Sequence, residues 1–331
     1  MAKVCIAGAG SWGLALAMVL EINGHDVTIW SALAKEIELL KTEHENKRCL
    51  PGVIIPPTIN LTENIEEALT DKDVIVMAVA SPYIRSTAAM FKPYIKPGQV
   101  IVDVAKGIEE SSLHTLSQVI LEELPQAKVA VLSGPTHAEE VSRFIPTTCV
   151  IGSEDEETGR FLQNLFMNEN FRIYTSTDVL GVELGGSLKN VIALAAGIAD
   201  GLGYGDNTKA ALITRGIHEI SRLGVAMGGR LQTFYGLTGM GDLIVTCASM
   251  HSRNRRAGIL IGQGKSMQEA MDEVQMVVEG VYSAKAALTL AHKYNVPMPI
   301  TEEINRVLFE GKSARDAVSE LMQRDKKVEY E

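Results

Sequence analysis

A glycine-rich turn close to the N-terminus constrains this chain more than any other feature. The segment Gly8-Ala9-Gly10-Ser11-Trp12-Gly13 fits the spacing GxGxxG, follows a short apolar run and opens a helical pattern. In that context Gly8 makes a tight turn, Gly10 lets a pyrophosphate approach the backbone, and Gly13 allows the helix to pack closely on the strand. The unpaired N–H groups at the helix start also favour an anion. The turn therefore predicts a dinucleotide-binding domain of the Rossmann type.

The pattern of elements along the chain predicts an α/β fold in two domains. Short β-rich runs alternate with helical patterns in the first half, which favours a mostly parallel sheet covered by helices. After about residue 180 only helical patterns follow, and a length of 331 residues fits two domains. We place a Rossmann domain at 1–184 and an all-helical domain at 185–331. The predicted strands are Val4–Ala7, Asp26–Trp30, Val74–Val79, Val100–Asp103, Val129–Leu132, Thr147–Ile151 and Phe171–Tyr174. The predicted helices include Ser11–Asn23, Ser112–Leu124, Gly181–Gly201, Lys209–Met227, Val281–Tyr294, Ile300–Phe309 and Ala314–Arg324.

Composition excludes several classes of protein. The chain carries 31 Lys and Arg against 41 Asp and Glu, a net charge of −10. Such a chain is a poor generic binder of nucleic acid or of an anionic membrane, although a local pocket can still hold an anion. Its cysteines are few and scattered, which indicates a reducing cytoplasm and gives no spacing for a metal site. We expect no metal, no nucleic-acid partner and no membrane insertion.

The choice between NAD and NADP stays open in the sequence. An acid that binds the ribose is expected near the end of the second strand, about twenty residues after the glycine turn. That strand ends at Trp30, and Ser31-Ala32-Leu33-Ala34 follow it without an acid or an arginine. Lys35 is the nearest cation, and Ser31 could bond to a hydroxyl or to a phosphate.

Two lysines are candidates for chemistry. Lys106 follows a buried strand, where ligands bind in open α/β sheets, although a solvated loop lysine is the alternative. Lys189 stands beside the apolar run Val191–Ala196, where burial would lower its pKa and make it a usable acid or base. The alternative is a lysine on a helix flank whose amine reaches water.

Two further segments are candidates for binding an anion. Ser133–Ala138 follows a strand and leads into a helical pattern, and ordinary helix capping by Thr136 is its alternative. Asp242 lies in a glycine-rich segment and could hold a lysine or a substrate hydroxyl. It is followed by three arginines at positions 253, 255 and 256, which suggest phosphate recognition or else a surface cluster with internal salt bridges.

Taken together, these segments resemble the soluble bacterial NAD(P)-dependent sn-glycerol-3-phosphate dehydrogenases over nearly the whole chain, roughly residues 3–322. Many dehydrogenases share the glycine turn, whereas the later segments together are specific to this family. The matching segments are Gly8–Leu16, Lys106–Glu109, Ser133–Val141, Gly181–Asn190, Thr214–Glu219, Gly236–Cys247, Ser252–Arg256 and Val277–Gly280.

The resemblance implies hydride transfer between a nicotinamide and C2 of dihydroxyacetone phosphate, which supplies glycerol 3-phosphate for phospholipid synthesis. Lys189 would be the proton donor or acceptor, Lys106 would add positive charge beside the reacting atoms, and Asp242 would hold Lys189 in its orientation. The implied coenzyme contacts, beyond the glycine turn, are Ser11, Trp12, Lys106, Ala138, Arg253, Val277 and Glu279. The implied substrate contacts are Lys106, Gly134, Thr136, Lys189, Asp242, Ser252, Arg253 and Asn254.

The resemblance also implies a homodimer formed through the helical half. This sequence departs from the family at Ala32, where many relatives carry His or Arg, and at His137, where Phe is common. The first departure bears on NADP preference and the second on local packing. Two other interpretations remain: another reductase of the same two-domain architecture, or a non-catalytic NAD(P)-binding sensor.

Overall fold

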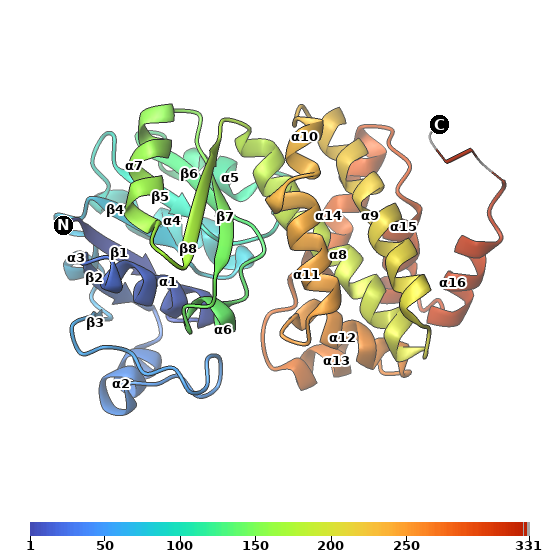
Figure 1. The fold of residues 1–331 in the computed structure, drawn as a ribbon, viewed down its shortest axis with the longest axis horizontal. Coiled ribbons are helices and arrows are strands. Elements are labelled where there is room, and N and C mark those ends of the chain that lie inside the picture. Colours follow the sequence, from blue (N-terminus) through green and yellow to red (C-terminus); the bar gives the residue numbers. More distant parts are fainter. Residues whose placement is uncertain (327, 330–331) are drawn as a thin grey trace.

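The computed structural model describes residues 1–326 and 328–329 and consists of a sheet-containing half followed by a helical half (Figure 1). Its eight-stranded sheet has the order β3-β2-β1-β4-β5-β6-β7-β8. All neighbours pair in parallel except β6 and β7, which are antiparallel. The mostly parallel sheet of the predicted α/β fold is thus confirmed. The strands are β1 Lys3–Ala7, β2 Asp26–Trp30, β3 Asn60–Thr62, β4 Val74–Met77, β5 Val100–Asp103, β6 Lys128–Ser133, β7 Thr147–Gly152 and β8 Phe171–Ser176.

Helices cover both faces of this sheet. One apolar core joins the sheet to α1 and α7, and a second core on the other face joins it to α3, α4 and α5. Because both faces are covered, the central strands are almost wholly buried, as their apolar sequences predict. The helical elements of this half are α1 Ser11–Ile22, α2 Ala34–Glu43, α3 Ile65–Leu69, η1 Ser81–Tyr83, α4 Ile84–Phe91, η2 Lys92–Tyr94, α5 Leu116–Glu123, α6 Ala138–Val141 and α7 Glu156–Phe166.

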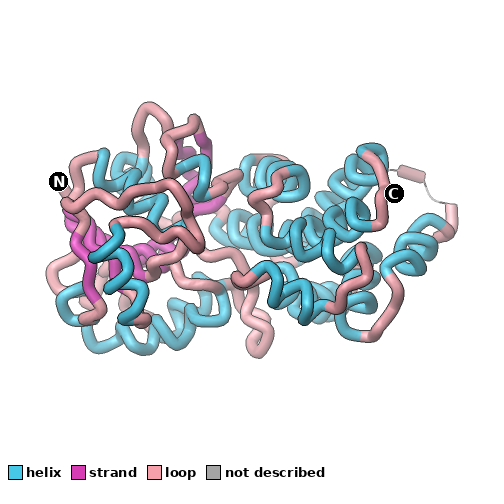
Figure 2. The backbone as a smooth tube through the Cα atoms, turned by 90° about the horizontal axis from the view of Figure 1, so that it is seen from below, coloured by secondary structure: helices cyan, strands magenta, loops and turns pink. Residues whose placement is uncertain are grey.

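The second half is helical throughout its described part, and Figure 2 shows the strands confined to the first half. Its core forms around the long helix α8, against which α9, α11, α12 and α14 pack. The helical elements are α8 Val179–Gly201, α9 Asp206–Ala226, α10 Leu231–Phe234, η3 Leu237–Gly241, α11 Asp242–Ala248, α12 Arg253–Gly262, α13 Met267–Val274, α14 Glu279–Lys293, α15 Pro299–Phe309 and α16 Ala314–Met322.

Helix α8 alone is long and apolar enough to cross a membrane among the described helices, judged by length and composition. However, 89% of its apolar window is buried inside the protein, so it serves as the core of the helical half. Close packing of α8 on α12 depends on glycines. A Cβ at Gly197 would lie 2.1 Å from the Arg255 carbonyl oxygen, and one at Gly258 would lie 2.2 Å from that of Leu194. This close approach brings the start of α12 beside the middle of α8.

Several predicted boundaries differ from the structure. The helix predicted at Ser112–Leu124 begins only at Leu116, because Leu113 adopts a left-handed conformation (φ 61°) and Thr115 caps the helix in a capping box with Gln118. The strand predicted to run to Val79 ends at Met77. The predicted domain division between residues 184 and 185 lies inside the continuous helix α8.

Candidate active site

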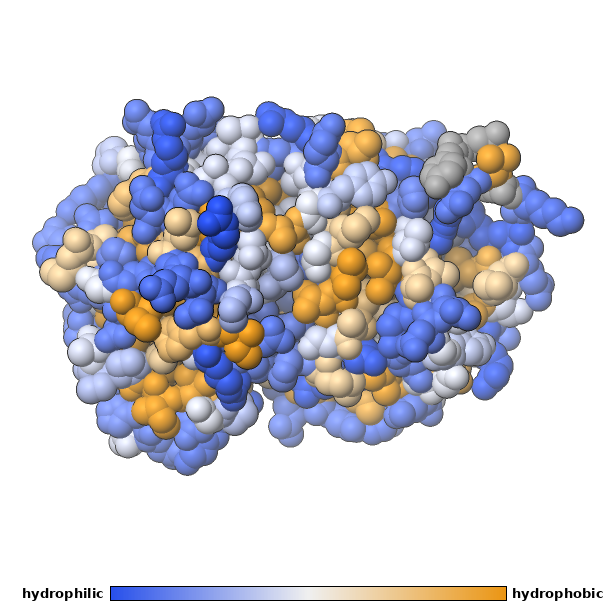
Figure 3. All heavy atoms as spheres, viewed as in Figure 1, coloured by the Kyte–Doolittle hydropathy of each residue, from blue (hydrophilic) through white to orange (hydrophobic). Residues whose placement is uncertain are grey.

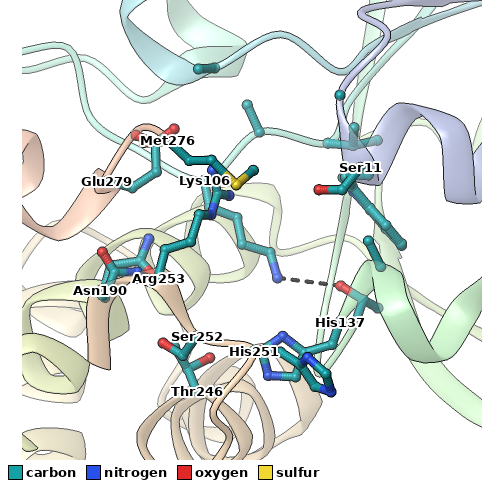
Figure 4. A pocket seen from close by; sticks show the side chains of 18 of the residues that line it. Ser11, Lys106, His137, Asn190, Thr246, His251, Ser252, Arg253, Met276 and Glu279 are labelled. Carbon is teal, nitrogen blue, oxygen red and sulfur yellow. Dashed lines mark hydrogen bonds between the residues drawn. The ribbon is translucent and has the colours of Figure 1, made fainter. Parts of the chain in front are cut away.

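The candidate site is a cavity of about 260 Å³ lined by residues from both halves of the chain. Loops that follow β1, β4, β5 and β6 form one wall, and the other wall comes from α8, α11, the start of α12 and the segment that precedes α14. The carboxyl ends of parallel strands are where open α/β sheets bind ligands. The close-up in Figure 4 shows Ser11 on one side, with Lys106, Arg253 and Glu279 on the other.

Asp242 joins the two candidate lysines. Its Oδ1 lies 2.5 Å from Lys189 Nζ, and its Oδ2 lies 2.7 Å from Lys106 Nζ. The lysines come from different halves, Lys106 from the loop after β5 and Lys189 from α8. The π-helical turn η3 ends directly before Asp242, and helix α11 begins at Asp242. Asp242 thus pairs with both lysines, one from each half of the chain.

Burial governs the charges of this cluster. Lys189 is 5% exposed, and burial, together with the charge of Lys106, lowers its pKa to about 7 although Asp242 opposes the shift. Burial alone would raise the pKa of Asp242, but the charges and hydrogen bonds of Lys106 and Lys189 outweigh it and hold that pKa below its usual value. A lysine that changes protonation near neutral pH is suited to acid–base chemistry.

Further hydrogen bonds orient the two amines. Lys106 donates to the Gly134 carbonyl oxygen at 2.9 Å and to Thr136 Oγ1 at 3.4 Å, the bond dashed in Figure 4. Lys189 donates to Thr246 Oγ1 at 2.6 Å. Thr246 lies four residues after Asp242 on α11, so both face the same way. Sequence reasoning did not single out Thr246, although this i, i+4 spacing was a usable signal.

The segment after β6 lies where the sequence analysis placed it, but Thr136 does not cap the following helix. The N-cap of α6 is His137, whose side chain makes no capping hydrogen bond, and the Thr136 hydroxyl donates instead to the Gly134 carbonyl oxygen at 3.1 Å. Gly134 has φ +148°, and a Cβ there would lie 2.9 Å from the Cys149 backbone. Only glycine fits this close turn against β7.

At the position where Phe is common in the family, His137 packs against another histidine. Its ring lies 5.8 Å from that of His251, centroid to centroid, and both rings line the cavity (Figure 4). Burial and the charge of Lys189 lower the His137 pKa to about 4. The imidazole is therefore neutral at physiological pH, which does not suit it to donate protons in place of Lys189.

The three arginines of the basic cluster have different surroundings. Arg253 and Arg256 line the cavity. Arg255 points elsewhere, because its Nε and Nη2 lie 2.8 and 2.7 Å from the carboxylate of Asp200. Arg255 thus forms the internal salt bridge that one interpretation predicted, whereas phosphate recognition by Arg253 and Arg256 stays a prediction.

Two neighbours of Arg253 have structural partners. Ser252 caps α12 by accepting the Arg255 N–H at 3.2 Å. The Asn254 amide donates to Asn190 Oδ1 at 3.0 Å and accepts the Gly280 N–H at 2.8 Å. Both Asn190 and Asn254 line the cavity, but Asn254 also ties α8 to α14. Sequence reasoning missed Asn190, which directly follows Lys189.

The glycine turn fits a dinucleotide. Gly8 has φ +127°, and a Cβ there would lie 2.6 Å from the Ala78 carbonyl oxygen. By contrast, a Cβ at Gly10 would meet nothing within 4 Å, and no side chain caps the start of α1. Beside this opening, Trp12 Nε1 is buried and has no hydrogen-bond partner among the described residues. Backbone donors at the helix start and open space next to Gly10 fit a pyrophosphate, and the buried indole N–H is a further donor beside them.

The remaining predicted coenzyme contacts lie at different places. Ala138 and Glu279 line the cavity. Val277 is half-buried and does not line it, whereas the preceding Met276 does. Both oxygens of Glu279 already accept hydrogen bonds from Ser81 in the other half of the chain, one from the backbone N–H at 3.2 Å and one from the hydroxyl.

Comparison with known proteins gives consistent matches. Residues 3–159 and 178–319 match the family models described as NAD-dependent glycerol-3-phosphate dehydrogenase N-terminus and C-terminus. A glycerol-3-phosphate dehydrogenase (NAD(P)+) of Agathobacter rectalis is 63% identical over 100% of this chain and 98% of its own length. The enzyme of that name from Fusobacterium nucleatum is 62% identical over 100% of this chain and 99% of its own.

A solved structure shows the same arrangement. The crystal structure of glycerol-3-phosphate dehydrogenase from Coxiella burnetii superposes with a TM-score of 0.94 at 37% sequence identity. The alignment covers 98% of this chain and 99% of that one. The similarity therefore includes both halves of the chain.

Proposed function

This chain belongs to the NAD-dependent glycerol-3-phosphate dehydrogenase family, and from this premise we propose that Lys189, Asp242 and Lys106 perform the proton chemistry of its reaction. The protein is an NAD(P)-dependent oxidoreductase that interconverts sn-glycerol 3-phosphate and dihydroxyacetone phosphate and so supplies glycerol 3-phosphate for phospholipid synthesis. The observation that carries the assignment of residues is the buried Lys106–Asp242–Lys189 cluster beside the cavity.

When bound, the nicotinamide coenzyme supplies the hydride for C2 of the substrate. Lys189 in its ammonium form stabilises the negative charge that grows on the ketone oxygen and then donates a proton to it. The carbonyl thus becomes an alcohol, and Lys189 is left as a neutral amine that solvent reprotonates. In the reverse direction the neutral amine takes the alcohol proton. Asp242 and Thr246 aim Lys189, since each bonds to its Nζ.

The substrate phosphate requires positive charge away from this cluster. Arg253 lines the cavity, and no hydrogen bond engages its side chain within the described part of the protein. It supplies donors that match a phosphate, with Ser252, Asn254, Gly134 and Thr136 as further substrate contacts. Holding the phosphate at one end fixes the ketone close to the hydride donor and to Lys189.

The coenzyme contacts are proposed on the fit of the glycine turn. Gly8, Gly10 and Gly13 shape the turn, Ser11 and Trp12 offer donors at its rim, and the other contacts are Lys106, Ala138, Arg253, Val277 and Glu279. We propose a domain division between residues 184 and 185, with most coenzyme contacts in the first domain and most substrate contacts in the second. Separate apolar cores in the two halves support this division.

We further propose a cytoplasmic homodimer. Its cysteines are free and buried, which supports a reducing compartment. Apolar residues gather on the face of the helical half shown in Figure 3, and its helices expose Val225, Leu231 and Ile244. An exposed apolar patch of this kind supports self-association through this half. Light scattering of the purified protein tests this proposal: a mass of about twice 35.8 kDa is expected, and a monomer would contradict it.

The decisive test of function follows nicotinamide absorbance while dihydroxyacetone phosphate is added to the enzyme with NADH or with NADPH. We expect stoichiometric oxidation of at least one coenzyme and formation of glycerol 3-phosphate. Binding of a coenzyme without oxidation across a wide pH range would favour the sensor interpretation. Oxidation only with a different ketone would favour another reductase.

A further inference from the structure

The end of strand β2 lies directly beside the glycine turn. The N–H of Gly8 donates to the carbonyl oxygen of Trp30, the last residue of β2, at 2.8 Å. Ser31 therefore follows the residue that holds the turn in place. In dinucleotide-binding folds this is where the ribose of the adenosine half lies.

The side chain of Glu36, from the next helix, places a carboxylate at this position. Ser31 is 5% exposed, and its hydroxyl donates to Glu36 Oε2 at 2.8 Å while accepting the Leu33 N–H at 3.1 Å. Glu36 lies in the first turn of α2, five residues after Ser31. Among the described residues, hydrogen bonds engage only Oε2 of this carboxylate, so Oε1 remains available to a ligand.

Other charges near this strand end are few. Ala32 carries none, Lys35 is exposed, and Lys47 pairs with Glu43 at 2.8 Å. Arg48 is the alternative to Glu36 as the residue that selects the coenzyme, because it carries the opposite charge. Both residues lie close enough to Cys49 to affect its pKa. Burial raises that pKa to about 11, the charge of Glu36 raises it further, and the charge of Arg48 opposes the shift.

The loop that carries Arg48 and Cys49 also packs on the glycine turn, because the Asn46 amide donates to the Ala9 carbonyl oxygen at 3.4 Å.

We propose that Glu36, held by Ser31, is the residue that selects the coenzyme and that it favours NAD(H) over NADP(H). Its carboxylate accepts a hydrogen bond from the ribose 2′-hydroxyl and repels the 2′-phosphate. This inference rests on the proposed function, because it assigns a specificity to the coenzyme site of that reaction. It departs from the positively charged residues that the family resemblance places at position 32.

The test measures dissociation constants of NADH and NADPH without substrate, by titrating nicotinamide fluorescence. The wild type is expected to bind NADH roughly tenfold or more tightly than NADPH, as loss of a charge-assisted hydrogen bond and gain of repulsion imply. Glu36→Gln should weaken NADH binding, tighten NADPH binding and move the ratio roughly tenfold toward NADPH. The matched control is Glu38→Gln, which changes an exposed glutamate on the same helix and should leave the ratio unaltered.

Two outcomes overturn the proposal. One is equal binding of the two coenzymes with no change of ratio in Glu36→Gln. The other is a wild-type preference for NADPH that disappears in Arg48→Gln, which would assign the selection to Arg48. Absence of binding by either coenzyme would contradict the proposed function itself, so the two failures are distinguishable. A far-ultraviolet circular dichroism spectrum of Glu36→Gln that matches the wild type shows that the variant is folded.

Discussion

Lys189 and Asp242 form a buried ion pair in which Nζ lies 2.5 Å from Oδ1 and neither side chain is more than 6% exposed. The pair spans two helices of the helical half, and Lys106 reaches the same carboxylate from the sheet-containing half. The proton chemistry of the site therefore depends on contact between the two halves.

Reduction of dihydroxyacetone phosphate should lose rate as pH rises through about 7, because burial and Lys106 lower the Lys189 pKa to that value and the ammonium is required. Oxidation of glycerol 3-phosphate, which needs the neutral amine, should gain rate over the same range. Lys106→Met removes a positive neighbour and should move the alkaline limb of kcat/KM for reduction to higher pH. The exposed Lys92→Met is the control, and an unmoved limb in Lys106→Met would contradict the coupling.

Arg253→Ala should raise the KM for dihydroxyacetone phosphate roughly tenfold to hundredfold, because it removes fork-like donors from the cavity. Arg255→Ala should instead leave KM nearly unchanged and lower the free energy of unfolding by about 1–3 kcal/mol, since it breaks the bond to Asp200. Steady-state kinetics and urea unfolding of both variants measure this. Equal effects of the two substitutions on KM would contradict the assignment of substrate binding to Arg253 and of a structural role to Arg255.

Ser81→Ala should raise the KM for the coenzyme by up to about tenfold with little change in kcat. The Ser81 hydroxyl and backbone N–H both bond to Glu279, and a Cβ at Gly107 would lie 2.5 Å from Ser81 Cβ, so the contact is tightly packed. Ser81 acts as a positioning residue for Glu279. The control is Ser86→Ala, because the Ser86 hydroxyl donates to the nearby Tyr83 carbonyl oxygen and has no other hydrogen-bond partner in the part of the chain that the structure describes. A fall in kcat alone would refute the positioning role.

Much of the fold could be predicted from local pattern. Strands such as Val100–Asp103 are buried on both faces and read as continuous apolar runs, so their positions matched. Strand β3, Asn60–Thr62, was missed, because it has three residues of which only Thr62 is buried. Edge strands this short carry almost no hydrophobic signal.

The site could be predicted only where residue type and position both signalled function. Lys189 stood out because a lysine within an apolar helix is costly to bury. Thr246 and Glu36 did not, since a threonine on a helix and a glutamate in a first helical turn are common for structural reasons alone. Their importance arises from tertiary contacts with Lys189 and with Ser31, which no local pattern contains.

Single-turnover reduction by Lys189→Met, with both substrates saturating, tests whether Lys189 donates the proton. We expect that the rate falls by about 10²- to 10⁴-fold, that the pH dependence near neutrality disappears, and that coenzyme binding stays near the wild-type value. A rate close to that of the wild type with the same alkaline limb would contradict the assignment of Lys189 as the proton donor.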